Sequence, residues 1–276
     1  MTISPSTTRP SVQTRVLLSK VPEVTIFFWI IKVLCTTVGE TFADYINKKL
    51  GDNLNTTTIV MSVLLAVALV FQFRAPKYIP AIYWVTVVLI SVVGTLITDN
   101  MVEHFHVSLT TSTIIFGLAM LASFAVWHAS EKTLSIHSIY TAKREAFYWL
   151  AILFTFALGT AAGDLIAEKY SLGYFKSALL FAGLIVLIAV AHTQFRLNAV
   201  LAFWGAYVLT RPLGASIGDL MSQPKTVPAD ADPGTQAGLG LGTTVTSLIF
   251  LGAILAVVLY LTNEERRHPT VVTDPV

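Results

Sequence analysis

The stretch YWLAILFTFALGTAAGD, residues 148–164, contains the pattern that decides the fold. It begins with an aromatic residue followed by Trp149, reaches Gly159 after nine further residues, and ends at Asp164 after four more. Everything before the aspartate is apolar enough to lie within a bilayer. An acidic side chain at the edge of such a segment is costly, so its presence indicates a site rather than a solvated surface.

The same pattern, with the same spacing, occurs three more times. The other copies are FWIIKVLCTTVGETFAD (28–44), YWVTVVLISVVGTLITD (83–99) and FWGAYVLTRPLGASIGD (203–219). Successive copies begin 55, 65 and 55 residues apart. A long pattern that recurs at a nearly constant interval indicates four copies of one structural unit.

The composition is that of an integral membrane protein. The chain has 276 residues, of which 54% are hydrophobic and 12% are charged, and its mean hydropathy is +0.70. A soluble domain has about 25% charged residues. The bilayer is therefore the expected environment, and no nucleic acid is expected as a partner.

Eight apolar segments run through the chain, each near the length of about 20 residues that a spanning helix needs. They cover residues 23–46, 55–73, 80–101, 109–129, 146–167, 175–195, 199–221 and 243–262. The odd-numbered segments carry the pattern and the even-numbered ones do not. The sequence therefore predicts an all-α protein with eight transmembrane helices, arranged as four repeated helical hairpins.

These hairpins define the predicted organisation of the chain. It comprises a disordered cytoplasmic N-terminal tail (1–20), repeat 1 (21–79), repeat 2 (80–144), repeat 3 (145–198), repeat 4 (199–264) and a cytoplasmic C-terminal tail (265–276). A repeat with an even number of helices keeps its orientation from one copy to the next. We therefore expect parallel, pseudo-symmetric repeats about the membrane normal, with four equivalent helices facing one central path.

Lysine and arginine residues predict which side faces the cytoplasm. Eleven of them lie on the side of the termini and five on the other side. By the positive-inside rule both termini are cytoplasmic. The eleven are Arg9, Arg15, Lys20, Arg74, Lys77, Lys132, Lys143, Arg144, Arg196, Arg266 and Arg267, and the five are Lys48, Lys49, Lys169, Lys176 and Lys225.

A polar column runs along one face of the patterned segments. Steps of four residues back from each repeated aspartate stay near one helix face. These steps reach nearly every charged residue inside the spans, as well as several hydroxyl groups. The column contains Asp44, Glu40, Thr36 and Lys32 in repeat 1, Asp99, Thr95 and Ser91 in repeat 2, Asp164 and Thr160 in repeat 3, and Asp219 and Arg211 in repeat 4. Such a column is expected to face protein or water rather than lipid.

Other positions of the pattern have more common roles. We expect the repeated tryptophans to anchor the helices at the membrane interface and the repeated glycines to permit close helix packing. Lys32, one turn from Trp29, is expected near the cytoplasmic end, where its amine could reach the interface.

The chemistry of the column favours a cation. Five carboxylates, Glu40 and the four repeated aspartates, face only two basic residues, Lys32 and Arg211. Protons or bound cations would relieve this excess of negative charge. Carboxylates together with the hydroxyls of Thr36, Ser91, Thr95 and Thr160 form a hard oxygen environment, which suits Mn, Mg or Ca better than Cu or Zn. The predicted metal ligands are Asp44, Asp99, Asp164, Asp219 and Glu40.

The chain also resembles a known group of proteins. The four patterns, together with Lys20-Val21-Pro22-Glu23-Val24-Thr25 and Thr37-Val38-Gly39-Glu40-Thr41, resemble a bacterial family of uncharacterised membrane-anchored proteins built from four copies of a repeat of unknown function. The resemblance covers about residues 20–265. It implies a multi-pass protein of the bacterial inner membrane and carries no activity with it.

We therefore expect a secondary transporter that moves a small cation, with manganese as the favoured example, in exchange for protons. Asp44, Asp99, Asp164, Asp219 and Glu40 would bind the cation or protons, while Lys32 and Arg211 would pair with acidic groups in the empty state. A channel or carrier for a small organic or anionic solute, with Lys32 and Arg211 as ligands, is the alternative. A membrane sensor or scaffold is the third hypothesis. No cofactor is expected, a homo-oligomer is compatible with the sequence, and the absence of hydrolase and paired-His metal motifs argues against an enzyme.

Overall fold

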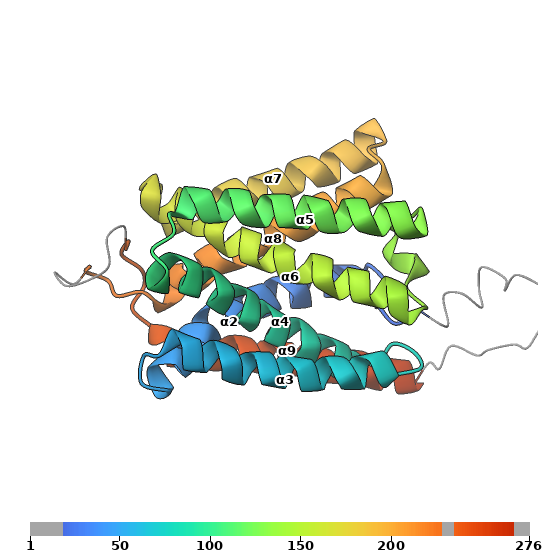
Figure 1. Ribbon diagram of the computed structural model, residues 1–276, viewed down its shortest axis with the longest axis horizontal. Helices are drawn as coiled ribbons and strands as arrows, with labels where there is room; N and C mark the ends of the chain where they lie inside the picture. Colours follow the sequence, from blue (N-terminus) through green and yellow to red (C-terminus); the bar gives the residue numbers. More distant parts are fainter. Residues whose placement is uncertain (1–18, 228–234, 268–276) are drawn as a thin grey trace, which may run out of the picture.

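The computed structural model describes residues 19–227 and 235–267, and these form a bundle of eight long helices (Figure 1). The helices are α2 (Ile26–Lys49), α3 (Leu54–Arg74), α4 (Pro80–Asp99), α5 (Leu109–Glu131), α6 (Ala142–Asp164), α7 (Tyr174–Phe195), α8 (Ala199–Ser222) and α9 (Gly242–Arg267). All eight are long and apolar enough to cross a membrane. The predicted number and positions of the spans are thereby confirmed, and the chain is a multi-pass membrane protein.

The ends of the helices follow local sequence signals. Side chains of Thr25, Asn53, Ser108, Thr141 and Asn198 cap the helices that they precede by accepting a backbone N–H. Helices α4 and α6 continue beyond their aspartates as π-helices, η1 (Asn100–His104) and η3 (Leu165–Lys169). Turns of this kind are rare and occur frequently at functional sites.

The four patterned helices form a closed inner ring. Helix α2 packs on α4, α4 on α6, α6 on α8, and α8 on α2. In an apolar stretch of 18 residues within each of these four helices more than half of the residues are buried, against fewer than a quarter in the corresponding stretches of α3, α5, α7 and α9. The outer helices present large apolar side chains such as Val63, Leu118, Leu187 and Leu255 outward, as lipid-facing helices do. The four patterned helices thus face a common centre, as predicted.

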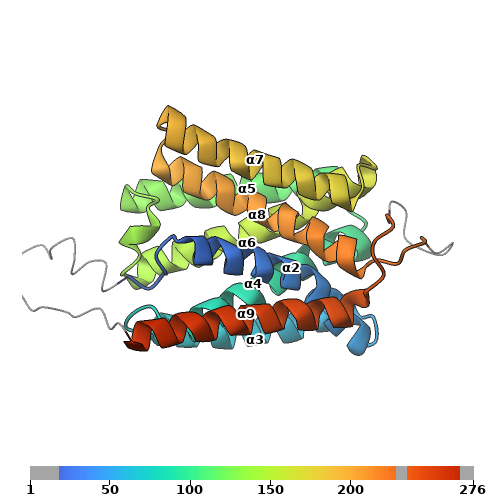
Figure 2. The same cartoon turned by 180° about the vertical axis from the view of Figure 1, so that it is seen from behind.

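Each outer helix packs on the inner helix of the following repeat. Helix α3 packs on α4, α5 on α6, α7 on α8, and α9 returns to α2; Figure 2 shows α9 beside α2. The two helices of one predicted hairpin have few contacts with each other. The two helices of one sequence repeat are therefore consecutive in the chain but make little contact. The helices that pack together come from two successive repeats.

The repeated glycines make the same contact at each step of the ring. A Cβ on Gly39 would collide with Ser91, one on Gly94 with Phe156, one on Gly159 with Arg211, and one on Gly214 with Thr36. In each case the contacted residue lies eight positions before the aspartate of the next repeat. The prediction that these glycines permit close packing is confirmed, and the contacts follow one cyclic order.

The repeated aromatic pairs form a second cyclic set, which we call the aromatic layer. The first aromatic residue of each pattern contacts the tryptophan of the next repeat. The ring centroids are 5.7 Å apart for Phe28 and Trp84, 5.5 Å for Tyr83 and Trp149, 6.1 Å for Tyr148 and Trp204, and 5.7 Å for Phe203 and Trp29.

Three of the four tryptophans of this layer are not interfacial anchors. Trp84, Trp149 and Trp204 are 2%, 3% and 6% exposed, and Trp29 is partly buried. The expectation of membrane anchoring was wrong for Trp84, Trp149 and Trp204, because cyclic packing turns these rings toward a neighbouring repeat. The aromatic layer lies at the end of the ring opposite the aspartates.

The start of the described chain is also held in place at this end. The predicted tail lies outside the described residues as far as residue 18, but Lys20 is buried and forms a 2.8 Å ion pair with Glu145. Gln72 donates to the same carboxylate over 3.0 Å. Because three separated segments meet in these bonds, Lys20 belongs to the folded bundle.

Candidate functional site

The polar column predicted from the sequence lies inside the ring. Its members at four, eight and twelve residues before each aspartate are buried in all four repeats. In order from the first to the last repeat they are Lys32, Thr36, Glu40, Val87, Ser91, Thr95, Ile152, Phe156, Thr160, Tyr207, Arg211 and Ala215. The four helices thus bring equivalent positions to one interior, which we call the polar centre.

Arg211 connects all four inner helices. Its Nη2 donates to Glu40 Oε2 of α2 over 2.5 Å, to Thr160 Oγ1 of α6 over 2.7 Å, and to Thr95 Oγ1 of α4. Its Nη1 donates to the carbonyl of Thr36 over 3.2 Å. Arg211 is fully buried, and its ion pair with Glu40 agrees with the predicted pairing of a basic residue with an acidic group of the column.

The Thr95 and Thr160 hydroxyls fit this network because each accepts from Arg211 and donates to a backbone carbonyl. Thr95 Oγ1 donates to the carbonyls of Gly39 and Ser91, and Thr160 Oγ1 donates to the carbonyl of Phe156. Thr36 Oγ1 donates to the carbonyl of Thr210 over 3.1 Å, which links α2 to α8. Buried polar groups are stabilising only when they are satisfied in this way.

The four repeated aspartates lie within electrostatic range of Glu40. Each of the carboxylates of Asp44, Asp99, Asp164 and Asp219 is close enough to Glu40 to interact with it, and most of them also interact with one another. We call these five residues the acidic ring. They lie toward the C-terminal ends of the inner helices, and their convergence on one shared site stays a prediction.

Exposure falls from the acidic ring inward. Asp44, Asp99 and Asp164 are partly exposed, whereas Asp219 and Glu40 are 6% and 7% exposed. Arg211 and Lys32 are 0% exposed. Side-chain exposure thus decreases from three of the repeated aspartates, through Asp219 and Glu40, to the two basic residues.

Lys32 differs most from its predicted position. It does not reach the membrane interface but is buried, with its Nζ 3.8 Å from the ring centroid of Phe156 and 4.1 Å from that of Tyr207. Within residues 19–227 and 235–267, Nζ has no hydrogen-bond partner. Two aromatic faces therefore hold the ammonium group by cation–π contacts, and no carboxylate pairs with it.

The metal prediction gains no geometric support. In the part of the chain that the structure describes, no group of three or more His, Cys, Asp and Glu side chains is arranged to hold a metal ion. Ser91, one of the predicted supporting hydroxyls, has no hydrogen-bond partner among the described residues.

The fourfold repeat also identifies the family. A family model described as Repeat of Unknown Function (DUF347) matches residues 27–78, 82–133, 147–197 and 202–267. The chain belongs to this repeat family. Each DUF347 copy here contains one inner helix, with its aromatic pair, glycine and aspartate, followed by one outer helix. The predicted resemblance to a four-repeat membrane family is confirmed, and no curated protein or solved structure matches the chain closely enough to count as similar.

Sequence reasoning missed the aromatic residues of this DUF347 site. Phe156 and Tyr207 occupy the column in the third and fourth repeats, but only the polar positions of the column were predicted to belong to the site. A signal was present, because both lie at steps of four from an aspartate. The Tyr83 and Tyr148 hydroxyls, 2.5 Å apart in the aromatic layer, occupy the first position of the pattern itself.

Proposed function

We propose that the chain is a secondary transporter that moves a cation through the polar centre in exchange for protons. The observation that carries this proposal is the inward order of groups: the partly exposed Asp44, Asp99 and Asp164, then the buried Arg211–Glu40 pair, then the aromatic layer. Acidic side chains inside a membrane protein mark ion pathways more often than structural contacts.

The Arg211–Glu40 pair gives this order a mechanism. A cation that moves inward from the aspartates meets Glu40 next, and Glu40 is already paired with Arg211. Entry of the cation therefore requires the guanidinium to release the carboxylate. Breaking a buried pair is costly unless another partner replaces it, so cargo binding is coupled to a rearrangement of the centre. A carboxylate that later loses its cation in a water-poor site gains by binding a proton instead.

The direction of the path follows from the distribution of basic residues. The excess of lysine and arginine on the side of the termini supports a cytoplasmic location for that end. The acidic ring would then face the opposite side of the bacterial inner membrane. The cation itself is also part of this proposal, and the oxygen-rich column suggests manganese as an example.

A carrier for a small anionic solute is the second candidate. The buried Lys32 ammonium, without a hydrogen-bond partner among the described residues, favours it, because an anion could satisfy this group. In that case Lys32 and Arg211 would be the ligands and the acidic ring would be peripheral.

Reconstitution tests the proposal. We expect liposomes that contain the purified chain and a pH-sensitive dye to release protons when Mn²⁺ or, separately, ethidium is added outside. Asp99→Asn should abolish this exchange under the cation hypothesis and leave solute movement intact under the anion hypothesis.

Asp52→Asn is the matched control for this experiment. Asp52 is exposed, and its left-handed backbone (φ 55°) is readily adopted by asparagine. Failure of both cations to drive proton release would overturn the proposal and leave the anionic-solute carrier and the sensor or scaffold as the remaining hypotheses.

A further inference from the structure

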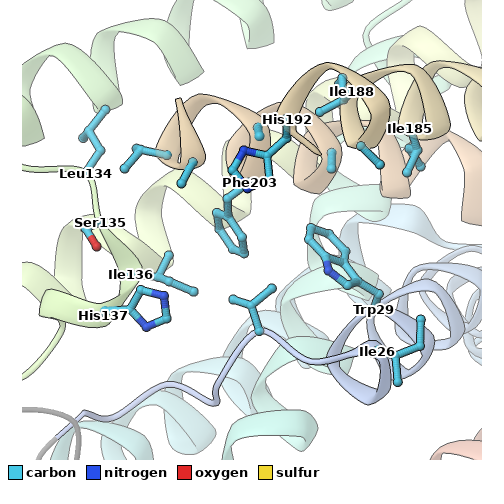
Figure 3. Close-up of a pocket in the computed structure, with 16 residues that line it drawn as sticks. Ile26, Trp29, Leu134, Ser135, Ile136, His137, Ile185, Ile188, His192 and Phe203 are labelled. Carbon is cyan, nitrogen blue, oxygen red and sulfur yellow. The ribbon is translucent and has the colours of Figure 1, made fainter. Parts of the chain in front are cut away.

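A cavity of about 630 Å³ opens at the end of the bundle opposite the acidic ring. It lies between the start of α2, residues 134–137, the end of α7 and the start of α8. Figure 3 shows the rings of Trp29 and Phe203 projecting into it, with His192 beside Phe203 and His137 farther along the wall. Its volume is within the range of pockets that bind drug-sized molecules.

The cavity marks the place where the cyclic arrangement is broken. In three steps of the ring the aromatic pairs are buried: Phe28 with Trp84, Tyr83 with Trp149, and Tyr148 with Trp204. In the fourth step, between the last repeat and the first, Phe203 and Trp29 are partly exposed and line the cavity. The aromatic layer is therefore closed at three interfaces and open at one.

The polar centre lies directly behind this opening. The Phe203 ring is 5.5 Å from the Tyr207 ring, and Tyr207 contacts the Lys32 ammonium. Lys32 lies one helical turn from Thr36, whose carbonyl binds Arg211. A short series of side chains thus connects the cavity with the Arg211–Glu40 pair.

The chemistry of this route suits one class of molecule. The cavity wall, as far as the chain is described, contains no Asp, Glu, Lys or Arg, so it favours an apolar body. Behind it, the faces of Phe156 and Tyr207 already hold an ammonium group, that of Lys32. Beyond this lies the acidic ring. An apolar entrance, an aromatic cation site and a carboxylate exit are together complementary to an amphipathic organic cation.

We propose that the cavity is the cytoplasmic entrance of the path and that the cargo is an amphipathic organic cation. This rests on the proposed transport function and narrows its cargo. The apolar part of the cargo packs between Trp29 and Phe203, and its cationic group replaces the Lys32 ammonium on the faces of Phe156 and Tyr207. Lys32 then acts as a tethered competitor that occupies the site when cargo is absent.

Binding of fluorescent probes to the purified full-length chain in detergent tests the proposal. Ethidium is the cationic probe, and N-phenyl-1-naphthylamine is a neutral aromatic probe. Ala189→Trp fills the cavity, since Ala189 lines it, whereas Val190→Trp is its control on the exposed, lipid-facing side of α7. We expect Ala189→Trp to weaken ethidium binding about tenfold or more and Val190→Trp to leave it unchanged.

Lys32→Met is a second variant, and it should change the affinity for ethidium in the opposite direction. Methionine removes the competing ammonium but keeps an apolar side chain of similar length, so the buried site remains filled. We expect ethidium binding to tighten about tenfold and binding of the neutral probe to stay the same. Lys48→Met, at an exposed lysine of the same helix, should change neither.

The outcomes separate this inference from the transport proposal. It is overturned if ethidium does not bind, if both tryptophan variants weaken binding equally, or if Lys32→Met does not tighten it. Mn²⁺-driven proton release without ethidium binding would overturn the inference and leave cation transport standing. Ethidium binding at the cavity without flux of either cation would instead overturn transport and, with it, the role of the cavity as an entrance.

Discussion

At the residue scale, the Arg211–Glu40 ion pair joins α8 to α2 inside the ring. Arg211 is fully buried and bonds to four residues from three other helices. A buried ion pair contributes little net stability, but removal of one partner leaves an uncompensated charge. Replacing one partner alone should therefore destabilise the protein more than its net contribution suggests, and replacing both partners together should destabilise it less.

We predict that Arg211→Met and Glu40→Gln are strongly coupled. Arg211→Met should destabilise the protein by about 3–5 kcal/mol, because Glu40 loses its counter-charge in a buried site. The double variant should cost less than the sum of the two single variants. Thermal unfolding in detergent of the four proteins measures the coupling, and additive effects would show that the two side chains do not interact.

The column of site residues could be found from the sequence because steps of four residues follow a helix face. The step placed Arg211, Glu40, Thr95 and Thr160 together without knowledge of the packing. For Lys32 and Trp84 the spacing predicted only the position along the helix axis, and this position alone indicated the membrane interface. The burial of these two residues depends on which neighbouring helix packs against their side of the helix. The sequence around each residue does not determine that packing.

At the element scale, the repeated glycines set how closely the inner helices approach. A Cβ on Gly214 would lie 2.8 Å from the backbone nitrogen of Thr37, which cannot move without shifting α2. Interhelical contact through small residues is a common basis of helix association in membranes.

We predict that Gly214→Ala destabilises the bundle by about 1–3 kcal/mol, as overpacking does. Gly183 and Gly252 are matched controls, because they lie in helices with no atom within 4 Å of an added Cβ. Alanine at either control should be neutral or slightly stabilising. Equal melting temperatures for Gly214→Ala and the controls would contradict the observed packing.

The spans themselves were predictable because each is a long apolar run. The partner of each outer helix was not. If each repeat packed as a helical hairpin, α3 would lie against α2, but in the structure α3 packs on α4 and α9 packs on α2. The order of helices along the chain does not determine which helices contact each other, because contact depends on the packing faces. The sequence of an outer helix contains no strong pattern that identifies such a face.

At the scale of the whole molecule, packing of the outer helix α9 on α2 closes the last repeat onto the first. The Ser247 hydroxyl of α9 donates to Thr41 Oγ1 of α2 over 2.9 Å. These residues are separated by almost the whole length of the bundle sequence, so their contact tests the closure directly.

We predict that Thr41→Cys with Ser247→Cys, in a Cys35→Ala background, forms a disulfide on mild oxidation. A protease site inserted between α8 and α9 makes the bond visible, since the two fragments stay together until they are reduced. Thr41→Cys with Leu248→Cys is the control, because Leu248 is 65% exposed and lies on another face of α9. Fragments that separate without reductant in the first pair would show that α9 does not pack on α2.

The central claim is that the four repeats share one acidic site, and flux through single variants tests it most directly. Proton release driven by Mn²⁺ or ethidium would be measured for the wild type, Asp52→Asn, and each of Asp44→Asn, Asp99→Asn, Asp164→Asn and Asp219→Asn. A shared site predicts that every one of these four variants loses flux by about tenfold or more, while Asp52→Asn keeps it. Four variants that each retain most of the wild-type flux would contradict the account.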